Sequence, residues 1–356
     1  MKRKVSFISL GIVLMLALVY GTSQARPMAP ALKVGVLISS SGPLYFAGAF
    51  QKAAAELAVS DLAKSVAVSL FYEDAGDTEA EAKSALARFS NRKIDLLLAP
   101  IESESAKRVL RLWDDPDVPV IATSSLAEGF AEKANFFRLV STVSQDSYAL
   151  AEFVTNQKPK SVAVVSSQDE YSKVVSKSVA FGLTMRGIEV KSVSFTDLAS
   201  LKKLKAESLI LVSMEQSAEL LSKMPGWLAG FRKVYLVPGN LANYSMFGFA
   251  KELDGATGLL AFDDVNQAFR VRLANQMNRQ NILSAPSSPM FGLARRTYQA
   301  IYLVADQLRK NGSIANLSET ALFTADGFYQ NQRYSVVRYS AAGVYSVIGV
   351  FDPKNP

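Results

Sequence analysis

The stretch KVGVLISSSGPLYFAGAFQKAAAELAVSDL, residues 33–62, decides the fold. Its apolar run from Val34 to Ile38 is typical of a strand covered on both faces, as in a parallel sheet. Three serines and a Gly-Pro pair follow, and apolar residues then recur at helical spacing from Phe50 to Leu62. A strand, a polar turn and a helix form the first half of a βαβ unit. Ligands of open α/β sheets bind beyond the carboxyl ends of the strands, so the serines stand where a ligand would bind.

The same alternation continues along most of the chain. Strand-like runs such as VAVSLFYED, IDLLLAP and SVAVVSSQDEY alternate with helix-like segments. This alternation predicts parallel sheets with helices on both faces, and two successive sets of it predict two lobes. The end of the chain differs, because SPMFGLARRTYQAIYLVADQLRKNG predicts one long helix and the following residues predict a hairpin of two alternating strands about Ala342 and Gly343.

The first residues have the form of a targeting segment. A basic start, MKRK, precedes a mostly apolar run, residues 5–20, and the small residues of TSQA follow. This pattern predicts a secretory signal peptide over residues 1–25 and a periplasmic mature protein. A retained membrane anchor is the competing interpretation, since a bilayer needs about 20 apolar residues. The chain has no cysteine, which excludes a bacterial lipoprotein and a disulfide-stapled module.

Composition limits the class of partner. The chain of 356 residues is long enough for two domains, and 49% of its residues are hydrophobic. Its formal charge is +7, but removal of the signal peptide takes away three basic residues and leaves 36 basic against 32 acidic ones. A net charge of about +4 spread along the chain is no nucleic-acid footprint. We therefore expect no nucleic-acid partner.

Several kinds of chemistry are missing. The chain has neither histidine nor cysteine, which excludes the ordinary serine triad, cysteine nucleophiles and typical zinc sites. No GxxxxGK[ST] or GxGxxG turn follows any strand. We expect no catalytic residues, no metal and no cofactor, and an enzyme is the least favoured class of function.

An ordered set of motifs points to a family. SSSGPLYFAG, YEDAGDTEAEAKSALARF, IDLLLAPIESESA, DVPVIATSS, FFRLVSTVSQDSYALAEFV and SVAVVSSQDEYSK resemble, in order and spacing, the type I periplasmic binding proteins of the leucine/isoleucine/valine-binding group. The resemblance covers nearly the whole mature chain and is strongest up to Tyr171. It implies an α/β fold of two Rossmann-like lobes with parallel sheets, joined by a three-crossover hinge. Such lobes close on a small molecule and deliver it to an ABC permease in the inner membrane.

The resemblance also implies limits for the lobes. The N-terminal lobe would comprise residues 32–141 plus 265–316, and the C-terminal lobe residues 142–264 plus 317–356. Receptors of this type commonly act as monomers, and we expect a monomer here.

Family motifs place several ligand contacts in the first lobe. Ser103 stands where amino-acid binders hold the ligand carboxylate, and Ser124 and Ser125 could supply further hydroxyl or main-chain groups. Leu126 takes the place of a threonine that helps to bind the α-amino group. In the opening stretch, Ser41, Tyr45 and Phe46 are further candidates. The serines there could also only cap the helix, and the two aromatic rings could only staple its start.

The second lobe gives four more candidates. Tyr171 matches a family tyrosine of the binding cleft, and Met214 or Glu215 falls where the family often has an aromatic or small residue. Asn240 stands about where amino-acid binders have the acidic residue that receives the ammonium group. Its neutral side chain, together with Leu126, disfavours a zwitterionic ligand unless Glu215 supplies the missing charge, because an unpaired ammonium in a closed cleft is costly.

The resemblance and these departures favour a solute receptor for a carboxylate or an apolar or aromatic molecule rather than for a standard amino acid. The alternative is a periplasmic regulator or sensor module of the same fold that binds a protein partner. A receptor should close by hinge motion on one small molecule, whereas a partner-binding module should expose an apolar patch.

Overall fold

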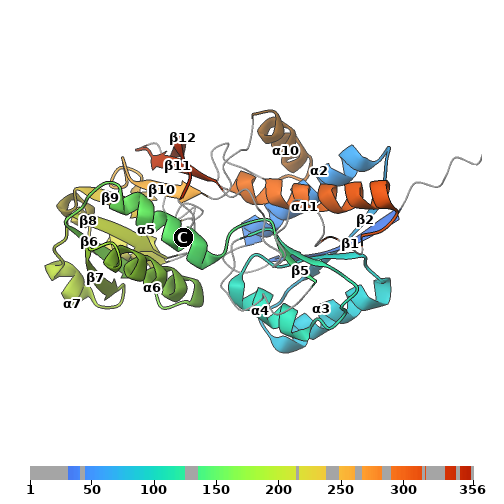
Figure 1. Ribbon diagram of the computed structural model, residues 1–356, viewed down its shortest axis with the longest axis horizontal. Coiled ribbons are helices and arrows are strands. Elements are labelled where there is room, and N and C mark those ends of the chain that lie inside the picture. The colour runs from blue at the N-terminus through green and yellow to red at the C-terminus, as the bar shows by residue number, and fades with distance from the viewer. Residues whose placement is uncertain are drawn as a thin grey trace, which may run out of the picture.

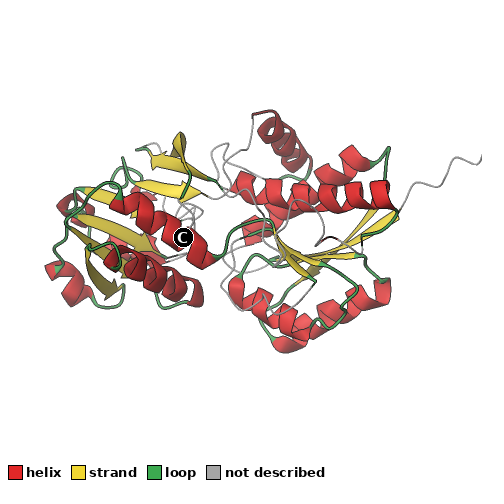
Figure 2. Ribbon diagram, in the orientation of Figure 1, coloured by secondary structure: helices red, strands yellow, loops and turns green. Residues whose placement is uncertain are grey.

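The computed structural model consists of two α/β lobes that lie side by side (Figure 1). It describes residues 31–40, 45–124, 135–213, 216–237, 248–260, 267–282, 290–314, 317, 333–341 and 345–353. The expected signal peptide lies outside these described residues. Each lobe is built on one sheet, and helices pack against both of its faces (Figure 2).

The first lobe has a five-stranded sheet in which all neighbouring strands are parallel. In the order β2-β1-β3-β4-β5, its strands are β1 (Ala31–Ile38), β2 (Ala67–Asp74), β3 (Leu96–Leu98), β4 (Val120–Ala122) and β5 (Phe136–Arg138). β1 lies between two other strands, and its Val34, Val36 and Leu37 are fully buried. Burial on both faces explains the continuous apolar run in the sequence of this strand.

Helices from distant parts of the chain cover this sheet. The helices of the first lobe are α2 (Tyr45–Leu62), α3 (Glu79–Arg92), α4 (Ser103–Leu112), α10 (Gln267–Arg279) and α11 (Met290–Asn311). α2 and α11 lie on one face and α3 and α4 on the other (Figure 1). Ile301 and Val304 of α11 pack in one buried cluster with Val34 and Leu96 of the sheet. The core of the first lobe therefore combines segments that lie far apart in the sequence, on either side of the second lobe's parallel strands.

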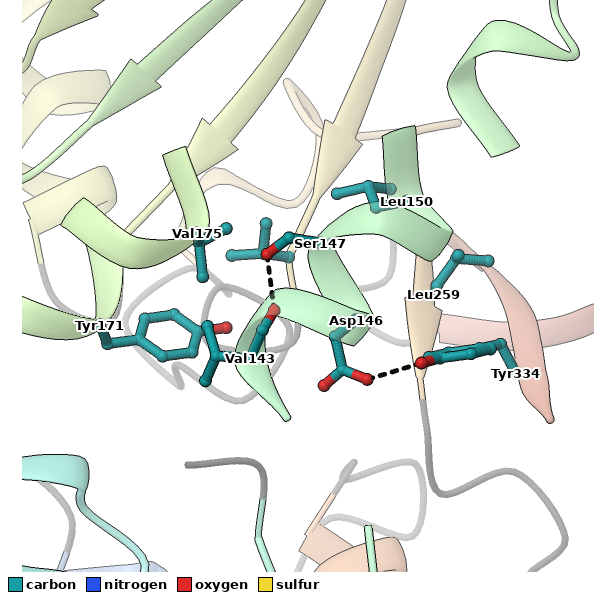
Figure 3. Close-up of a pocket in the computed structure, with 9 residues that line it drawn as sticks. Val143, Asp146, Ser147, Leu150, Tyr171, Val175, Leu259 and Tyr334 are labelled. Carbon is teal, nitrogen blue, oxygen red and sulfur yellow. Dashed lines mark hydrogen bonds between the residues drawn. The ribbon is translucent and has the colours of Figure 1, made fainter. Parts of the chain in front are cut away.

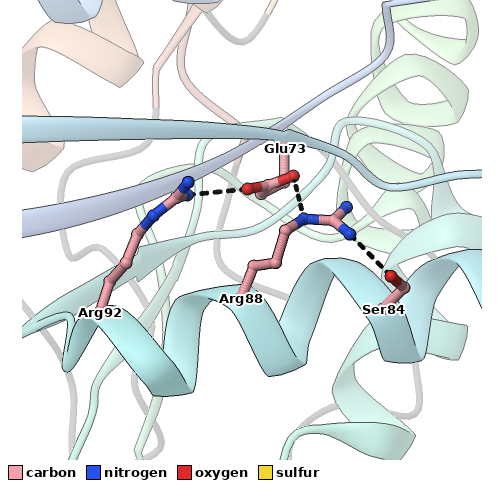
Figure 4. A network of polar contacts seen from close by, with 4 residues as sticks. All are labelled: Glu73, Ser84, Arg88 and Arg92. Atoms are coloured by element: carbon pink, nitrogen blue, oxygen red, sulfur yellow. Dashed lines mark hydrogen bonds and ion pairs between the residues drawn. The ribbon is translucent and has the colours of Figure 1, made fainter.

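Local polar contacts determine where α3 begins and how it docks. Thr78 and Glu81 form a capping box, in which each side chain accepts a hydrogen bond from the backbone N–H of the other residue. Glu73 of the outer strand β2 accepts hydrogen bonds from Arg88 at 2.6 Å and from Arg92 at 2.7 Å (Figure 4). These contacts fasten α3 to the edge of the sheet.

The second lobe has a seven-stranded sheet of order β12-β11-β10-β9-β8-β6-β7. Its strands are β6 (Ser161–Ser166), β7 (Glu189–Ser194), β8 (Ser208–Val212), β9 (Lys233–Leu236), β10 (Thr257–Leu260), β11 (Tyr334–Tyr339) and β12 (Tyr345–Phe351). Its helices are α5 (Val143–Thr155), α6 (Glu170–Thr184), α7 (Leu198–Lys203), α8 (Gln216–Lys223) and the 3-10 turn η1 (Trp227–Gly230). The five strands from β6 to β10 are parallel to one another, and β11 pairs antiparallel with both β10 and β12.

The two strands of the predicted C-terminal hairpin pair antiparallel, but they do not alternate between buried and exposed residues, and the predicted turn at Ala342 and Gly343 lies outside the described residues. β11 is buried at five of its six positions because its side chains pack into two buried clusters, Val337 and Tyr339 into one and Tyr334 and Val336 into the other. β12 forms the edge of the sheet and exposes Val347, Ile348 and Val350. A register shift between Val336 and Val337 interrupts the pairing of the two strands. The expectation of two alternating strands was therefore wrong.

The chain passes between the lobes three times. It leaves the first lobe after β5, returns from β10 to α10, and leaves again from α11 to β11. The two parallel-sheet lobes and these three connections confirm the fold class predicted from the sequence.

A buried tyrosine of β9 allows a test of the packing in the core of the second lobe. Tyr235 is 1% exposed, it lies edge-to-face with Phe153 at 6.2 Å, and burial raises the pKa of its hydroxyl to about 12. Within the described part of the chain this hydroxyl has no hydrogen-bond partner. We expect Tyr235→Phe to leave the free energy of unfolding unchanged or to raise it by about 1 kcal/mol, because it removes an unpaired polar group. Urea unfolding measures this change.

The matched control is Tyr334→Phe, because the Tyr334 hydroxyl donates a 2.8 Å hydrogen bond to Asp146 and its loss should destabilise the protein. A clear loss of stability in Tyr235→Phe would show that the Tyr235 hydroxyl is satisfied after all.

Candidate ligand-binding site

The serine loop after β1 is anchored to the end of the neighbouring strand. The Ser40 hydroxyl and the Ser40 backbone N–H both donate to the carboxylate of Asp74, the last residue of β2. The other oxygen of Asp74 accepts a 3.0 Å hydrogen bond from the N–H of Gly76. This carboxylate therefore orders the start of the loop at the carboxyl edge of the sheet. Ser41, the candidate from this loop, lies outside the described residues.

The first turn of α2 passes directly over this loop. A Cβ atom at Gly48 would lie 2.2 Å from the carbonyl oxygen of Ser39 and 3.0 Å from its carbonyl carbon. Both are backbone atoms, so the contact could not be relieved by a change of rotamer. Glycine is thus required where the helix meets the loop.

The two aromatic candidates at the start of α2 differ in environment. Tyr45 is 61% exposed, and its ring lies edge-to-face with Phe46 at 6.1 Å. Phe46 is half-buried and packs against the cluster that joins α2 to α10 and α11. Phe46 therefore contributes to the packing of the helix start, and Tyr45 extends from it into solvent.

The loops after β3 and β4 meet at the same edge of the sheet. Ser103 is the first residue of α4. The half-buried Ser124 donates a 3.1 Å hydrogen bond to the carbonyl of Ile101, which ties the two loops together. Gln51 of α2 is fully buried behind them and donates to Thr123 at 3.4 Å. Ser125 and Leu126 are outside the described part of the chain.

A mostly apolar hollow lies at the carboxyl edge of the second sheet (Figure 3). We call it the second-lobe hollow, and its lining residues are Val143, Asp146, Ser147, Leu150, Tyr171, Val175, Val237, Leu259 and Tyr334. They come from the N-terminal halves of α5 and α6, from β10, from the residue after β9 and from the start of β11. Its cavity volume is only about 10 Å³, room for about one water molecule, so it is a shallow depression in the surface of the second lobe. This half of the protein offers apolar contact surface with a few polar groups, as small-molecule sites generally do.

Asp146 is the acidic residue of this hollow, and two parts of the chain bind it. The Ser141 hydroxyl, from the first connection between the lobes, donates to the Asp146 carboxylate. The Tyr334 hydroxyl, from the end of the third connection, donates to the same oxygen at 2.8 Å. Burial and the adjacent Asp146 charge raise the pKa of Tyr334, so its hydroxyl remains a donor. Asp146 thereby links two of the connections on which hinge motion depends.

The structure brings Tyr171 into this hollow, with its ring beside Val143 (Figure 3). The three other second-lobe candidates, Met214, Glu215 and Asn240, fall outside the described residues. Ser213, directly before two of them, is buried and its hydroxyl accepts a 2.8 Å hydrogen bond from the N–H of Gln216.

Most residues of the second-lobe hollow were not singled out from the sequence. One signal was available: Thr142 and Gln145 form a capping box that marks the start of α5. Residues 143, 146, 147 and 150 then share one helical face. No local signal could have added Val237, Leu259 and Tyr334, because three separate strands bring them to the hollow.

These features define a two-lobed α/β binding protein. Polar loops lie at the carboxyl edge of the first sheet, and an apolar hollow lies at the carboxyl edge of the second sheet. Residues 31–205, just under half of the chain, match the family model described as periplasmic binding protein, a family of non-enzymatic receptors. Among curated protein sequences, none matches the chain. Within the described residues, no helix combines the length and the hydropathy needed to cross a membrane.

Solved structures with the same fold include receptors for two kinds of ligand. LivJ, the branched-chain amino acid transporter substrate-binding protein of Streptococcus pneumoniae, in complex with isoleucine, is 16% identical with a TM-score of 0.74, over 90% of this chain and 99% of that one. An ABC transporter solute-binding protein of R. palustris in complex with benzoate is 17% identical with a TM-score of 0.70, over 90% and 96%. A second one, in complex with 4-hydroxybenzoate, is 13% identical with a TM-score of 0.75, over 90% and 97%. At these identities the likeness establishes the fold.

Proposed function

We propose that this protein is a periplasmic solute receptor whose two lobes close on a small molecule and deliver it to an ABC permease of the inner membrane. The observation that carries the proposal is the second-lobe hollow at the carboxyl edge of its sheet, combined with the polar loops at the carboxyl edge of the first sheet. Residues 32–141 plus 265–316 would move as one lobe and residues 142–264 plus 317–356 as the other. The receptor would act as a monomer.

The ligand we propose is a carboxylate with an apolar or aromatic body. The aliphatic side chains of Val143, Val175 and Leu259 suit such a body. A ligand carboxylate would bind at the first lobe, where α4 begins at Ser103 and backbone N–H groups are available. This orientation also keeps it away from the negative charge of Asp146.

The isoleucine and benzoate complexes of the similar structures represent the two alternatives. Asn240 and Leu126, which would leave an ammonium group poorly paired, favour the acid without an amino group.

A thermal-shift screen of the chain from Arg26 onward tests this assignment. The panel contains branched-chain amino acids, the matching 2-keto acids, benzoate and 4-hydroxybenzoate. A ligand at about 100 times its Kd adds roughly 2.7 kcal/mol to stability, which is visible as a rise in Tm. We expect shifts with the acids and none with the amino acids. Shifts with the amino acids alone would refute the ligand class, and no shift with any solute would favour a module that binds a protein partner.

Two substitutions test the walls of the proposed site. Ser103→Ala and Tyr171→Ala should each weaken binding of the acid found in the screen about 10-fold, or about 1.4 kcal/mol, through lost polar or ring contacts. Isothermal titration calorimetry measures the change. Tyr302→Ala is the control, because Tyr302 is 44% exposed on α11 and does not line the hollow. Wild-type affinity in both site variants would refute this placement of the ligand.

A further inference from the structure

One ion pair joins the two lobes within the described residues. Lys107 of α4 in the first lobe donates a 2.6 Å hydrogen bond to a carboxylate oxygen of Glu170 in the first turn of α6 in the second lobe. The other ion pairs of the described chain connect residues of the same lobe.

Both partners have oppositely charged residues close to them in sequence on their own helices, yet they pair across the lobes. Glu104 lies 4.0 Å from the Lys107 ammonium group, a longer contact than the one to Glu170. Glu170 is followed on α6 by Lys173 and Lys177, but the hydrogen bond from Lys107 is the main reason why the pKa of the Glu170 carboxyl is lowered. Lys107 is therefore directed to the other lobe.

The pair connects the two elements that carry the proposed ligand contacts. Glu170 directly precedes Tyr171, whose ring lines the second-lobe hollow. Lys107 lies four residues after Ser103 on α4, which places both residues on the same face of that helix. A change in the separation of α4 and α6 therefore changes both the distance between the two charged groups and the distance between the two proposed walls of the site.

We propose that Lys107 and Glu170 are positioning residues, which hold α4 and α6 at the separation where both walls reach one ligand and so favour the closed arrangement. The lysine and glutamate side chains are 36% and 39% exposed, so water and salt screen the pair and it can break when the lobes open. The role in ligand affinity depends on the proposed function, whereas the role in lobe separation does not.

The absence of cysteine allows a direct test of lobe separation. Ala87→Cys on α3 and Ala199→Cys on α7 place one fluorescent label on an exposed helical position of each lobe. We measure energy transfer in single molecules without ligand. Lys107→Met and Glu170→Gln should each increase the ratio of open to closed molecules about 3-fold, and the double variant should increase it no further. In 1 M NaCl the wild type should approach the variants.

Lys83→Met is the matched control, since it removes a 2.8 Å ion pair with Glu79 inside α3 and should leave energy transfer unchanged. Wild-type energy transfer in both single variants, or additive effects in the double variant, would refute the proposal. Affinity for the acid found in the screen should fall about 3-fold in parallel. If the thermal-shift screen finds no ligand, that result refutes the proposed function but not the proposed role of the ion pair, because energy transfer still measures lobe separation.

Discussion

Replacement of Gly48 by alanine is expected to lower the free energy of unfolding by about 3 kcal/mol, the upper part of the range for overpacked sites. The sign of this change is informative, because alanine is a better helix former than glycine by about 1 kcal/mol and would stabilise α2 if there were no clash. The added Cβ would lie 2.2 Å from the Ser39 carbonyl oxygen, so either the helix or the serine loop must move. Movement of the loop also displaces the first-lobe wall of the proposed site.

Urea unfolding and ligand titration measure the two consequences of Gly48→Ala separately. The control is Gly230→Ala in η1, where an added Cβ meets no atom within 4 Å and stability should change by less than about 0.5 kcal/mol. A Gly48→Ala protein that is more stable than the wild type would show that helix and loop can separate at no cost.

The second large effect is expected for Asp146→Ala, which should destabilise the protein by about 3 kcal/mol. The substitution removes the acceptor of two hydrogen bonds to a charged group, from Ser141 and Tyr334. It also leaves the hydroxyl of Tyr334, a residue only 2% exposed, without this partner. Because these donors belong to two different connections between the lobes, we expect the variant to loosen the hinge as well.

Asp146→Asn is the matched control for this prediction. The amide oxygen can still accept from both hydroxyls, so the loss should be about half as large, since only the charge assistance disappears. Urea unfolding gives the stabilities, and energy transfer between the two labelled lobes gives the spread of lobe separations. Equal stability of the wild type and Asp146→Ala would show that the two connections are held by other contacts.

Local sequence patterns predicted the alternating strands and helices of two lobes, whereas the three-crossover hinge was expected from the family resemblance. The continuous apolar run of β1, the capping box at Thr78 and the long helix that ends before Gly312 each specify an element through contacts between near neighbours in sequence. The hairpin shows the limit of such patterns. The burial of β11 and the exposure of β12 depend on which strand lies at the edge of the sheet, and the two sequences do not encode that position.

The proposed site was less accessible from the sequence. Tyr171 could be identified because it matches a family motif at the start of α6, whereas Asp146 and Tyr334 are 188 residues apart and meet only after the third connection is made. The ion pair of Lys107 could not be predicted from the sequence either, because its partner, Glu170, belongs to the other lobe. Contacts of this kind follow from the arrangement of whole lobes and not from the spacing of residues.

The position of α11 has a consequence for folding. This helix covers β1 and β3, yet it is synthesised after every strand from β6 to β10. The buried clusters of the second lobe likewise include Tyr334 and Val337 of β11, which are synthesised later still. Contacts between such distant segments slow the folding of a domain. Neither core can therefore be completed until almost the entire polypeptide has emerged from the ribosome.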